Sequence, residues 1–318
     1  MTDRCVQRVL VTGGSGFLGS HVLEVMAQRG YRDVVAPTHA EYDLTEQADV
    51  RAMFEAVRPQ VVVHLAGLVG GILANRERLA EFHHENLMMD ALVHHEAWRA
   101  GVDKHLTVIG GCSYPADVAS PIREDSLFRG MPQAESAPFA MAKAMSVVRA
   151  QAYREQYGFN SIVLVPGNMY GPRDHFDLHD SHVIAALVRK FVEARGSHAS
   201  SVTVWGSGRP TRDFVYVEDV AQVLVDALEQ YDGAEIVNIS SGVQVSIRAL
   251  AETIARLTSY DGAIEYDTSM PDGQLDKGYD VTRMRTLLHA SCDTSLDDGL
   301  RRTIAWFEAS RVAGAVRP

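Results

Sequence analysis

Short apolar runs alternate with longer amphipathic stretches through the first half of the chain. The runs predict strands at residues 8–12, 34–36, 61–65, 105–109 and 161–165. The segments between them predict helices that end near residue 29 or that span about 49–57, 86–100 and 139–157. Apolar strands alternating with helices are typical of a parallel sheet covered on both faces. The pattern therefore predicts an α/β fold with a doubly wound parallel sheet.

The composition of the chain changes after Pro166. Gly, Pro, Asp and His become frequent up to residue 182, which predicts a loop that lines a cleft. Residues 202–206 predict a further strand, and residues 213–228 predict a strand and a helix that return to the main domain. We expect a cofactor-binding domain and a smaller α/β substrate-binding domain. The first would comprise residues 1–165 with a returning segment at about 213–240, and the second residues 166–212 and 241–318.

A glycine-rich segment follows the first predicted strand and opens the first helix. Its glycines fit the pattern Gly14-x-Gly16-x-x-Gly19 and also the wider spacing that begins at Gly13. Glycines let the backbone approach a pyrophosphate, and the helix N-terminus offers N–H groups and a partial positive charge. The segment therefore predicts a Rossmann-type dinucleotide site. The residues expected to bind the cofactor are Gly13, Gly16, Phe17, Leu18, Gly19, Asp43, Leu44, Ala66, Lys143 and His182.

The end of the second predicted strand bears on the choice between NAD and NADP. It contains His39 but no arginine that could hold a 2′-phosphate, and the glycine loop carries Ser15 rather than a basic residue. The expected cofactor is therefore NAD or NADP, with NAD favoured. Asp43 could accept a hydrogen bond from the adenine amine, or it could belong to a helix N-cap near Thr45.

Composition narrows the class of partner and the setting. The chain has 318 residues, 46% of them hydrophobic, so it can bury a large core. A net charge of -11 disfavours nucleic acid and anionic membranes as partners. Three widely spaced cysteines indicate neither a disulfide framework nor a metal site. We find no apolar run of membrane-spanning length and no signal peptide, so we expect a cytoplasmic protein.

The segment Phe139-Ala140-Met141-Ala142-Lys143 is the most informative one for chemistry. In short-chain dehydrogenases a Tyr-x-x-x-Lys pair lies on one helical face, and the phenol passes a proton to or from the substrate oxygen. Phe139 stands where that tyrosine is expected, and it has no proton to pass. Lys143 could still bind the cofactor ribose, or it could be an ordinary exposed lysine.

Further segments resemble the extended short-chain dehydrogenases, and most closely the GDP-L-fucose synthases. The matching segments are residues 68–72, 112–115, 167–172, 181–184, 204–208, 212–214 and 271–273 together with Lys277. The resemblance covers the whole chain. It implies an enzyme that epimerises a GDP-linked 4-keto-6-deoxy sugar at C3 and C5 and then reduces it with NADPH, and it implies a homodimer.

The resemblance assigns catalytic roles to single residues, and this chain keeps some of those residues and lacks others. The family's epimerisation acid and base fall on Cys112 and His182, and the redox lysine falls on Lys143. The redox tyrosine falls on Phe139, and the family's catalytic serine falls on Gly110, so both of these groups are lost. The residues that the resemblance assigns to the substrate pocket are Asn168, Ser113, Trp205, Arg212, Lys277 and Phe139.

Two local alternatives concern residues near these positions. Ser113 could replace the lost serine, although adjacent residues of an extended segment point to opposite faces. His182 lies in a stretch with His175 and His179, which is compatible with a metal cluster, but the surrounding residues predict a loop and we expect no metal. A deliberate substitution of one residue could explain Phe139 alone. The second loss, at Gly110, argues against this explanation.

We therefore expect an epimerase that acts beside a 4-keto group of a GDP-linked sugar through Cys112 and His182, with weak or absent reduction. The first alternative is an ordinary epimerase-reductase with a substitute proton donor, such as water or Ser113. The second is a non-catalytic subunit that binds a nucleotide sugar.

Overall fold

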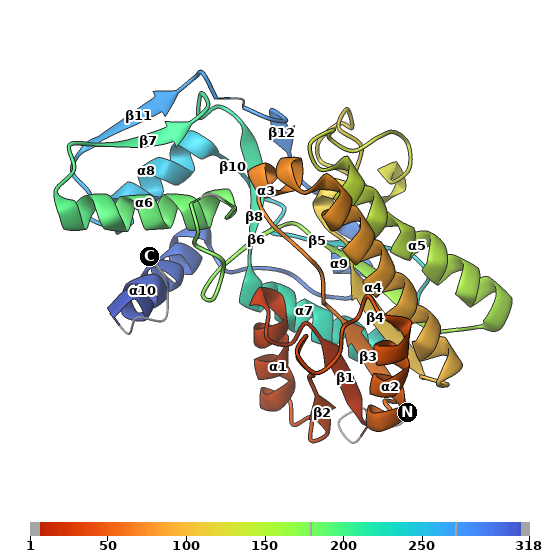
Figure 1. The fold of residues 1–318 in the computed structure, drawn as a ribbon. Helices are drawn as coiled ribbons and strands as arrows, with labels where there is room; N and C mark the ends of the chain where they lie inside the picture. Colours follow the sequence, from red (N-terminus) through yellow and green to blue (C-terminus); the bar gives the residue numbers. More distant parts are fainter. Residues whose placement is uncertain (1–6, 179, 271, 313–318) are drawn as a thin grey trace.

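The computed structural model describes residues 7–178, 180–270 and 272–312, and a six-stranded parallel sheet forms its centre (Figure 1). The strand order is β2-β1-β3-β4-β5-β9. The strands are β1 (Val9–Thr12), β2 (Val34–Val35), β3 (Val61–His64), β4 (Lys104–Val108), β5 (Ser161–Pro166) and β9 (Val237–Ile239). The four residues of β1 and of β3 are all buried, which is why these strands read as continuous apolar runs.

Helices cover both faces of this sheet. Alternate residues of β1 face opposite ways: Val9 and Val11 pack in one core with helices α1 (Phe17–Gln28) and α7 (Val217–Gln230). Leu10 packs in another core with α2 (Gln47–Val57) and α4 (Leu79–Arg99), and α5 (Ala137–Tyr157) lies against α4. The predicted doubly wound parallel sheet is therefore confirmed.

The chain leaves β1 towards β2 on one side, and β3 lies on the other side of β1. This reversal of strand order opens a crevice at the carboxyl ends of β1 and β3, where nucleotide ligands bind in such sheets. The fold therefore places the glycine loop at the position where a dinucleotide site is expected.

A second group of elements lies beside the central sheet, at the upper left of Figure 1. Strand β8 (Thr211–Tyr216) pairs with β6 (Asn168–Tyr170), with β10 (Gln244–Ser246) and with β12 (Asp276–Lys277), while β7 (Ser201–Trp205) pairs with β11 (Ala263–Asp267). Their apolar core includes α6 (Val183–Ser197), α8 (Ile247–Leu257) and α10 (Leu296–Val312). Helix α9 (Thr282–Leu287) packs instead on the core of the central sheet, through Met284.

Two local expectations were wrong. The helix expected from residue 86 begins at Leu79 and follows a short helix, α3 (Ile72–Glu77). The loop expected at 166–182 contains β6, which pairs with β8. The strand predicted from residue 213 is β8, which pairs within this second sheet but places Val215 in the core of the central sheet, and the helix after it, α7, packs on α1. The pairing of β6 with β8 joins distant segments, and no local pattern reports it.

Buried Lys104 ties the central sheet to helix α7. Its ammonium donates hydrogen bonds to the carbonyl oxygens of Ala227, Leu228 and Tyr231, at 3.0, 2.8 and 2.5 Å. These carbonyls end α7, where a cation is favoured by the helix dipole. The buried charge of Lys104 is thus explained by capping of α7 and by its ion pair with Asp232 (2.9 Å).

Candidate active site

A pocket of about 440 Å³ lies over the carboxyl ends of β1, β2 and β3. Five of the residues expected to bind the cofactor line it: Gly13, Gly16, Asp43, Leu44 and Ala66. The loops after three neighbouring strands meet here. The fold therefore gathers residues that are up to 53 positions apart in the sequence.

The shape of the glycine loop fits a dinucleotide. Gly13 has φ +73°, and a Cβ there would lie 2.6 Å from the backbone nitrogen of Ala66, so no larger residue fits. A Cβ on Gly19 would lie 2.0 Å from the Gly13 oxygen, which lets α1 pack tightly on the loop. The cap at Gly16 makes no side-chain hydrogen bond, so the first N–H groups of α1 remain available to a pyrophosphate.

The three residues that open α1 have different surroundings. Leu18 is buried in the core, Phe17 is half-buried at the edge of that core, and Gly19 packs against Gly13. These side chains do not line the pocket. Their expected contact with the cofactor would therefore be made through backbone N–H groups.

The adenosine end of the pocket carries a negative charge. Thr38 and His39 line it, and Glu41 accepts hydrogen bonds from the Thr38 N–H (2.7 Å) and hydroxyl (2.8 Å). Asp43 accepts from the N–H and hydroxyl of Thr45, at 2.9 and 2.7 Å. Asp43 thus closes a turn before α2, whose N-cap is Glu46 and not Thr45, and it also lines the pocket.

Lys143 is not an exposed helical lysine. Its ammonium donates to Asp90 Oδ1 (3.0 Å), and both side chains are buried. His64 lies 2.8 Å from the same carboxylate and 2.6 Å from the Thr12 hydroxyl, which lines the pocket. Burial favours a raised pKa for Asp90, but Lys143 and His64 hold that pKa well below its usual value. A buried charged network therefore fixes Lys143 beneath the cofactor pocket.

Phe139 occupies an apolar position one turn before Lys143. It is 8% exposed, and its ring meets Phe82 edge to face, with centroids 6.1 Å apart. Ala74 shares this cluster, while Leu68 and Cys112 pack against it. Phe139 is therefore part of a formed apolar contact next to the candidate cysteine.

Gly110 lies directly against both neighbouring site residues. A Cβ at this position would be 3.0 Å from Cys112 Sγ and 3.8 Å from a ring carbon of Phe139. The position that the resemblance assigns to the family's serine is therefore next to the thiol and the ring. The first of these two contacts is tight.

Cys112 lies in a short 3₁₀ turn, Gly111–Ser113, that follows β4. Burial raises the pKa of the thiol, while Lys277 and Lys143 act to lower it. Cys112 is a free cysteine and partly exposed. It combines the access and the cationic neighbours that a proton-transferring thiol needs.

Basic residues expected at the substrate diphosphate come together near Cys112. Lys277 pairs in register with Arg212 between β12 and β8, and burial lowers the pKa of Lys277. Arg212 donates to the carbonyl oxygens of Thr211 (2.7 Å) and Gln274 (2.6 Å), which holds the guanidinium in place. The pair forms a local positive site in an acidic protein.

Asn168 and Trp205 stand on separate strands around these residues. Asn168 is on β6 and donates to the Asp213 carbonyl (3.0 Å), beside Arg212. Trp205 ends β7, is 46% exposed, and has the Lys190 ammonium 5.3 Å from the centre of its ring. Pro271, in the expected segment 271–273, lies outside the described residues.

Ser113 is not placed to replace the lost serine. It is buried, and its hydroxyl donates to the Ala140 carbonyl (3.0 Å). Ser113 therefore secures the turn that carries Cys112 to α5. We do not propose it as a proton donor or as a substrate contact.

His182 caps α6 without making a capping hydrogen bond. Its side chain reaches solvent, yet surrounding protein atoms lower its pKa, and His175 lowers it further. The loop before His182 is anchored by a hydrogen bond from the Gly71 N–H to the Asp180 carbonyl (2.5 Å). Leu68, three residues before Gly71, packs against the cluster that contains Phe139 and Cys112. Within the described residues we find no direct contact between His182 and Cys112.

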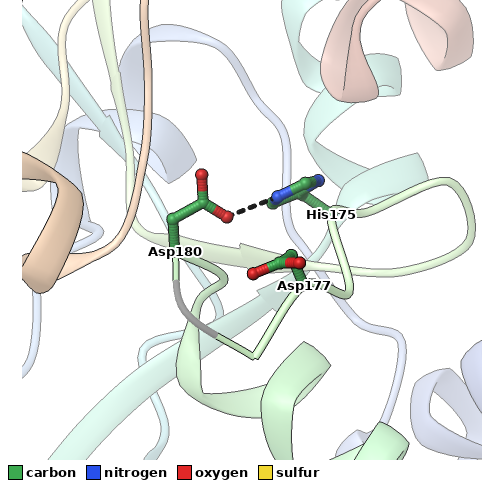
Figure 2. A group of neighbouring side chains, drawn as sticks. All are labelled: His175, Asp177 and Asp180. Carbon is green, nitrogen blue, oxygen red and sulfur yellow. Dashed lines mark hydrogen bonds and ion pairs between the residues drawn. The ribbon is translucent and has the colours of Figure 1, made fainter. Parts of the chain in front are cut away.

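The histidine-rich loop holds a small polar group. Figure 2 shows His175, Asp177 and Asp180 facing one another, with ligand atoms within 4.8 Å. His175 and Asp180 interact at 2.5 Å. His179 lies outside the described residues, and His182 does not join the group. The expectation of no metal remains a prediction.

Asp174 is a buried carboxyl in the same loop. One of its oxygens accepts from the His175 N–H (2.8 Å), and the other has no partner among the described residues. Burial raises its pKa to about 7. The folded protein therefore keeps a proton here that the unfolded chain releases at lower pH.

We predict that this group makes stability fall as pH rises. Between about pH 4 and 7 the unfolded chain ionises Asp174 while the folded protein does not, which disfavours the folded state by up to about 4 kcal/mol. Asp174→Asn should be similar to wild type at pH 4 and more stable at pH 8. Urea unfolding at both values checks this, and an equal difference at both would contradict it.

The sequence did not point to Tyr279, whose hydroxyl lies near Cys112. Tyr279, just after β12, places its hydroxyl against Gly111, where a Cβ would lie 2.1 Å from it. Its position 167 residues after Cys112 gave no local signal. The register of Lys277 with β8 is what brings Tyr279 to the site.

The sequence of this chain is similar to those of known enzymes. A profile of the NAD dependent epimerase/dehydratase family matches residues 9–240. GDP-L-fucose synthase 1 of Arabidopsis thaliana is 38% identical over 307 residues, which are 96% of this chain and 94% of that protein. The resemblance to GDP-L-fucose synthases is therefore confirmed.

Solved structures extend the likeness to the fold. A GDP-L-fucose synthetase from Naegleria fowleri bound to NADP superposes with a TM-score of 0.89 at 26% identity, covering 97% of this chain and 96% of that chain. A GDP-mannoheptose C4 reductase from Campylobacter jejuni, with NADP bound, gives 0.87 at 27% identity, covering 96% and 99%. Fold, glycine loop and profile agree: the chain belongs to the NAD dependent epimerase/dehydratase family.

Proposed function

We propose that this protein is an epimerase that acts beside the 4-keto group of a GDP-linked sugar, with weak or absent reductase activity. The observation that carries the proposal is Phe139, packed edge to face on Phe82 where a proton-donating phenol is expected. Cys112, the epimerisation thiol, is in place next to it. The site thus keeps a group for proton exchange at carbon and lacks the donor for reduction.

Cys112 and His182 are the proposed proton carriers. Burial raises the pKa of Cys112 overall, and Lys277 and Lys143 oppose this rise; in the proposal the thiolate form accepts a proton from carbon next to the ketone. His182 would return the proton, and its lowered pKa makes its imidazolium form a readier proton donor. We predict that His182→Asn lowers exchange at one or both carbons. Unchanged exchange at both, followed by mass, would contradict this role.

Arg212 and Lys277 are proposed to bind the diphosphate. The two cations are adjacent, and the guanidinium of Arg212 is held by backbone carbonyls. This arrangement suits a bidentate contact to phosphate oxygens. Asn168 and Trp205 would contact the rest of the nucleotide sugar. The relatives that act on GDP-linked sugars support guanine as the base.

The test is incubation with GDP-4-keto-6-deoxymannose in deuterated water, read by mass. Deuterium uptake at carbon supports the epimerase. Uptake coupled to equal NAD(P)H consumption supports the bifunctional epimerase-reductase instead. Tight binding of the sugar nucleotide without either reaction would favour a non-catalytic subunit.

The cofactor is proposed to be NAD(P), held by the glycine loop and Lys143, with a preference for NAD. When bound, NAD(P) supplies hydride chemistry at its nicotinamide. The charge of Glu41 on Thr38 and the lack of an arginine near His39 disfavour a 2′-phosphate. Both solved relatives above hold NADP, which counts against this preference.

Calorimetry decides the cofactor. We predict that NADH binds at least as tightly as NADPH, and that Glu41→Gln shifts the ratio towards NADPH because it removes the charge. NADPH bound tenfold tighter to the wild type, about 1.4 kcal/mol, would reverse the preference.

Three broader expectations also stay proposals. The sheet of β1 to β9 would carry the cofactor, and the elements around β8 would carry the nucleotide sugar. A homodimer is supported by the exposed apolar side chains Val148 and Tyr157 on α5, and light scattering would check it.

Every helix of the described ranges is too short or too polar to cross a membrane. Free Cys112 and Cys292 support a reducing, cytoplasmic setting, which cell fractionation would test.

A further inference from the structure

The hydroxyl of Tyr279 occupies the place of a side chain next to Cys112. Tyr279 is 3% exposed, and a Cβ built on Gly111 would lie 2.1 Å from its oxygen. The oxygen is therefore within about 4 Å of the Gly111 Cα, and consecutive Cα atoms are about 3.8 Å apart. Gly111 is flanked by Gly110 and Cys112, so the hydroxyl lies against the turn that carries the thiol.

The fold leaves this hydroxyl unengaged. Among the described residues the Tyr279 oxygen makes no hydrogen bond, whereas the neighbouring Tyr114 hydroxyl donates to Asn238 (2.6 Å) and Ser113 donates to Ala140. Burial raises the pKa of Tyr279, and Cys112 and Asp213 raise it further. The phenol therefore stays protonated and can donate a hydrogen bond.

Proton removal beside a ketone needs such a donor. As the C–H bond breaks, its electron pair forms a carbon–carbon double bond and the C4 carbonyl pair moves onto the oxygen. That enolate oxygen must be stabilised where the charge develops. Phe139 offers no donor for it, Gly110 has no side chain, and Ser113 is committed to the backbone of α5.

We propose that the Tyr279 hydroxyl donates a hydrogen bond to the C4 oxygen while Cys112 takes the proton from the adjacent carbon. Tyr279 keeps its own proton throughout, and the proton on Cys112 or His182 returns to carbon, so no other reactant is needed. This inference rests on the proposed epimerase function. It gives the site an oxyanion donor from β12 in place of those lost from α5 and from the loop after β4.

The test compares Tyr279→Phe with Tyr114→Phe. Tyr279→Phe should lower the rate of deuterium uptake about 10²–10³-fold at saturating substrate, the usual effect of removing one such donor, with KM and the affinity for GDP unchanged. Tyr114→Phe removes a hydroxyl from the adjacent ring, 6.2 Å away between centroids, and should leave the exchange rate unchanged.

A rescue separates the hydroxyl from the bulk of the ring. Tyr279→Leu frees the space above Gly111, and adding Gly111→Ser returns a hydroxyl to it, so the double variant should exchange faster than Tyr279→Leu alone. Wild-type exchange in Tyr279→Phe, with Cys112→Ala inactive, would overturn this inference and leave the epimerase intact. Loss of GDP affinity or of fold in Tyr279→Phe would make its role structural and also overturn it. Absence of exchange in the wild type would overturn both.

Discussion

Cys112→Ala is expected to abolish deuterium uptake at the carbons beside the ketone. A positioned acid or base contributes about 10²–10⁴-fold to such a step, and no other thiol of the described residues lies in this cluster. Binding should persist, because the phosphate contacts are assigned to Arg212 and Lys277, and alanine leaves their strands intact.

Cys292→Ala is the matched control. That thiol is also free, but it is buried and packs against Met284 in the core of the central sheet, away from the cluster of Cys112. It should lose some stability and keep the exchange rate. Exchange at the wild-type rate in Cys112→Ala would remove the thiol from the mechanism.

Phe139→Tyr combined with Gly110→Ser is expected to raise NAD(P)H oxidation on a 4-keto substrate by several orders of magnitude. Reduction leaves an alkoxide that must be protonated and stabilised, and each of the two hydroxyls supplies a factor of about 10² or more. Lys143 is already fixed on the same face of α5 by Asp90. Phe139→Tyr alone should therefore recover part of the activity.

The two substitutions differ in their steric demands. A Cβ at position 110 would lie 3.0 Å from Cys112 Sγ, so the thiol must shift by a few tenths of an ångström in Gly110→Ser. Gly110→Ala is thus the control, because it introduces the same contact without a hydroxyl. An inert double variant that still binds both ligands, or brisk reduction by the parent, would contradict our interpretation of Phe139.

Local patterns were sufficient to predict the central sheet and the cofactor end of the site. Continuous apolar runs mark the buried strands, and the glycines of the first loop are required by close backbone contacts that the structure shows at Gly13 and Gly19. The segment after β4 brings Cys112 to the sheet edge. These features depend on a few adjacent residues, so one sequence reveals them.

Pairing between distant segments could not be predicted in this way. The ion pair of Lys143 with Asp90 joins α5 to α4 across 53 residues, and no local pattern shows that this lysine is buried. Ser113 was expected near the substrate, but the approach of α5 directs its hydroxyl to Ala140. Tyr279 reaches the site only through the register of β12 with β8.

The central claim is that this protein exchanges protons at carbon without reducing the ketone. The most direct test measures both in one reaction: deuterium incorporated into GDP-4-keto-6-deoxymannose and NAD(P)H oxidised, with the cofactor in excess. We predict many deuterium atoms incorporated for each NAD(P)H oxidised. A ratio near the one or two expected of a coupled epimerase-reductase, or oxidation without deuterium uptake, would contradict the account.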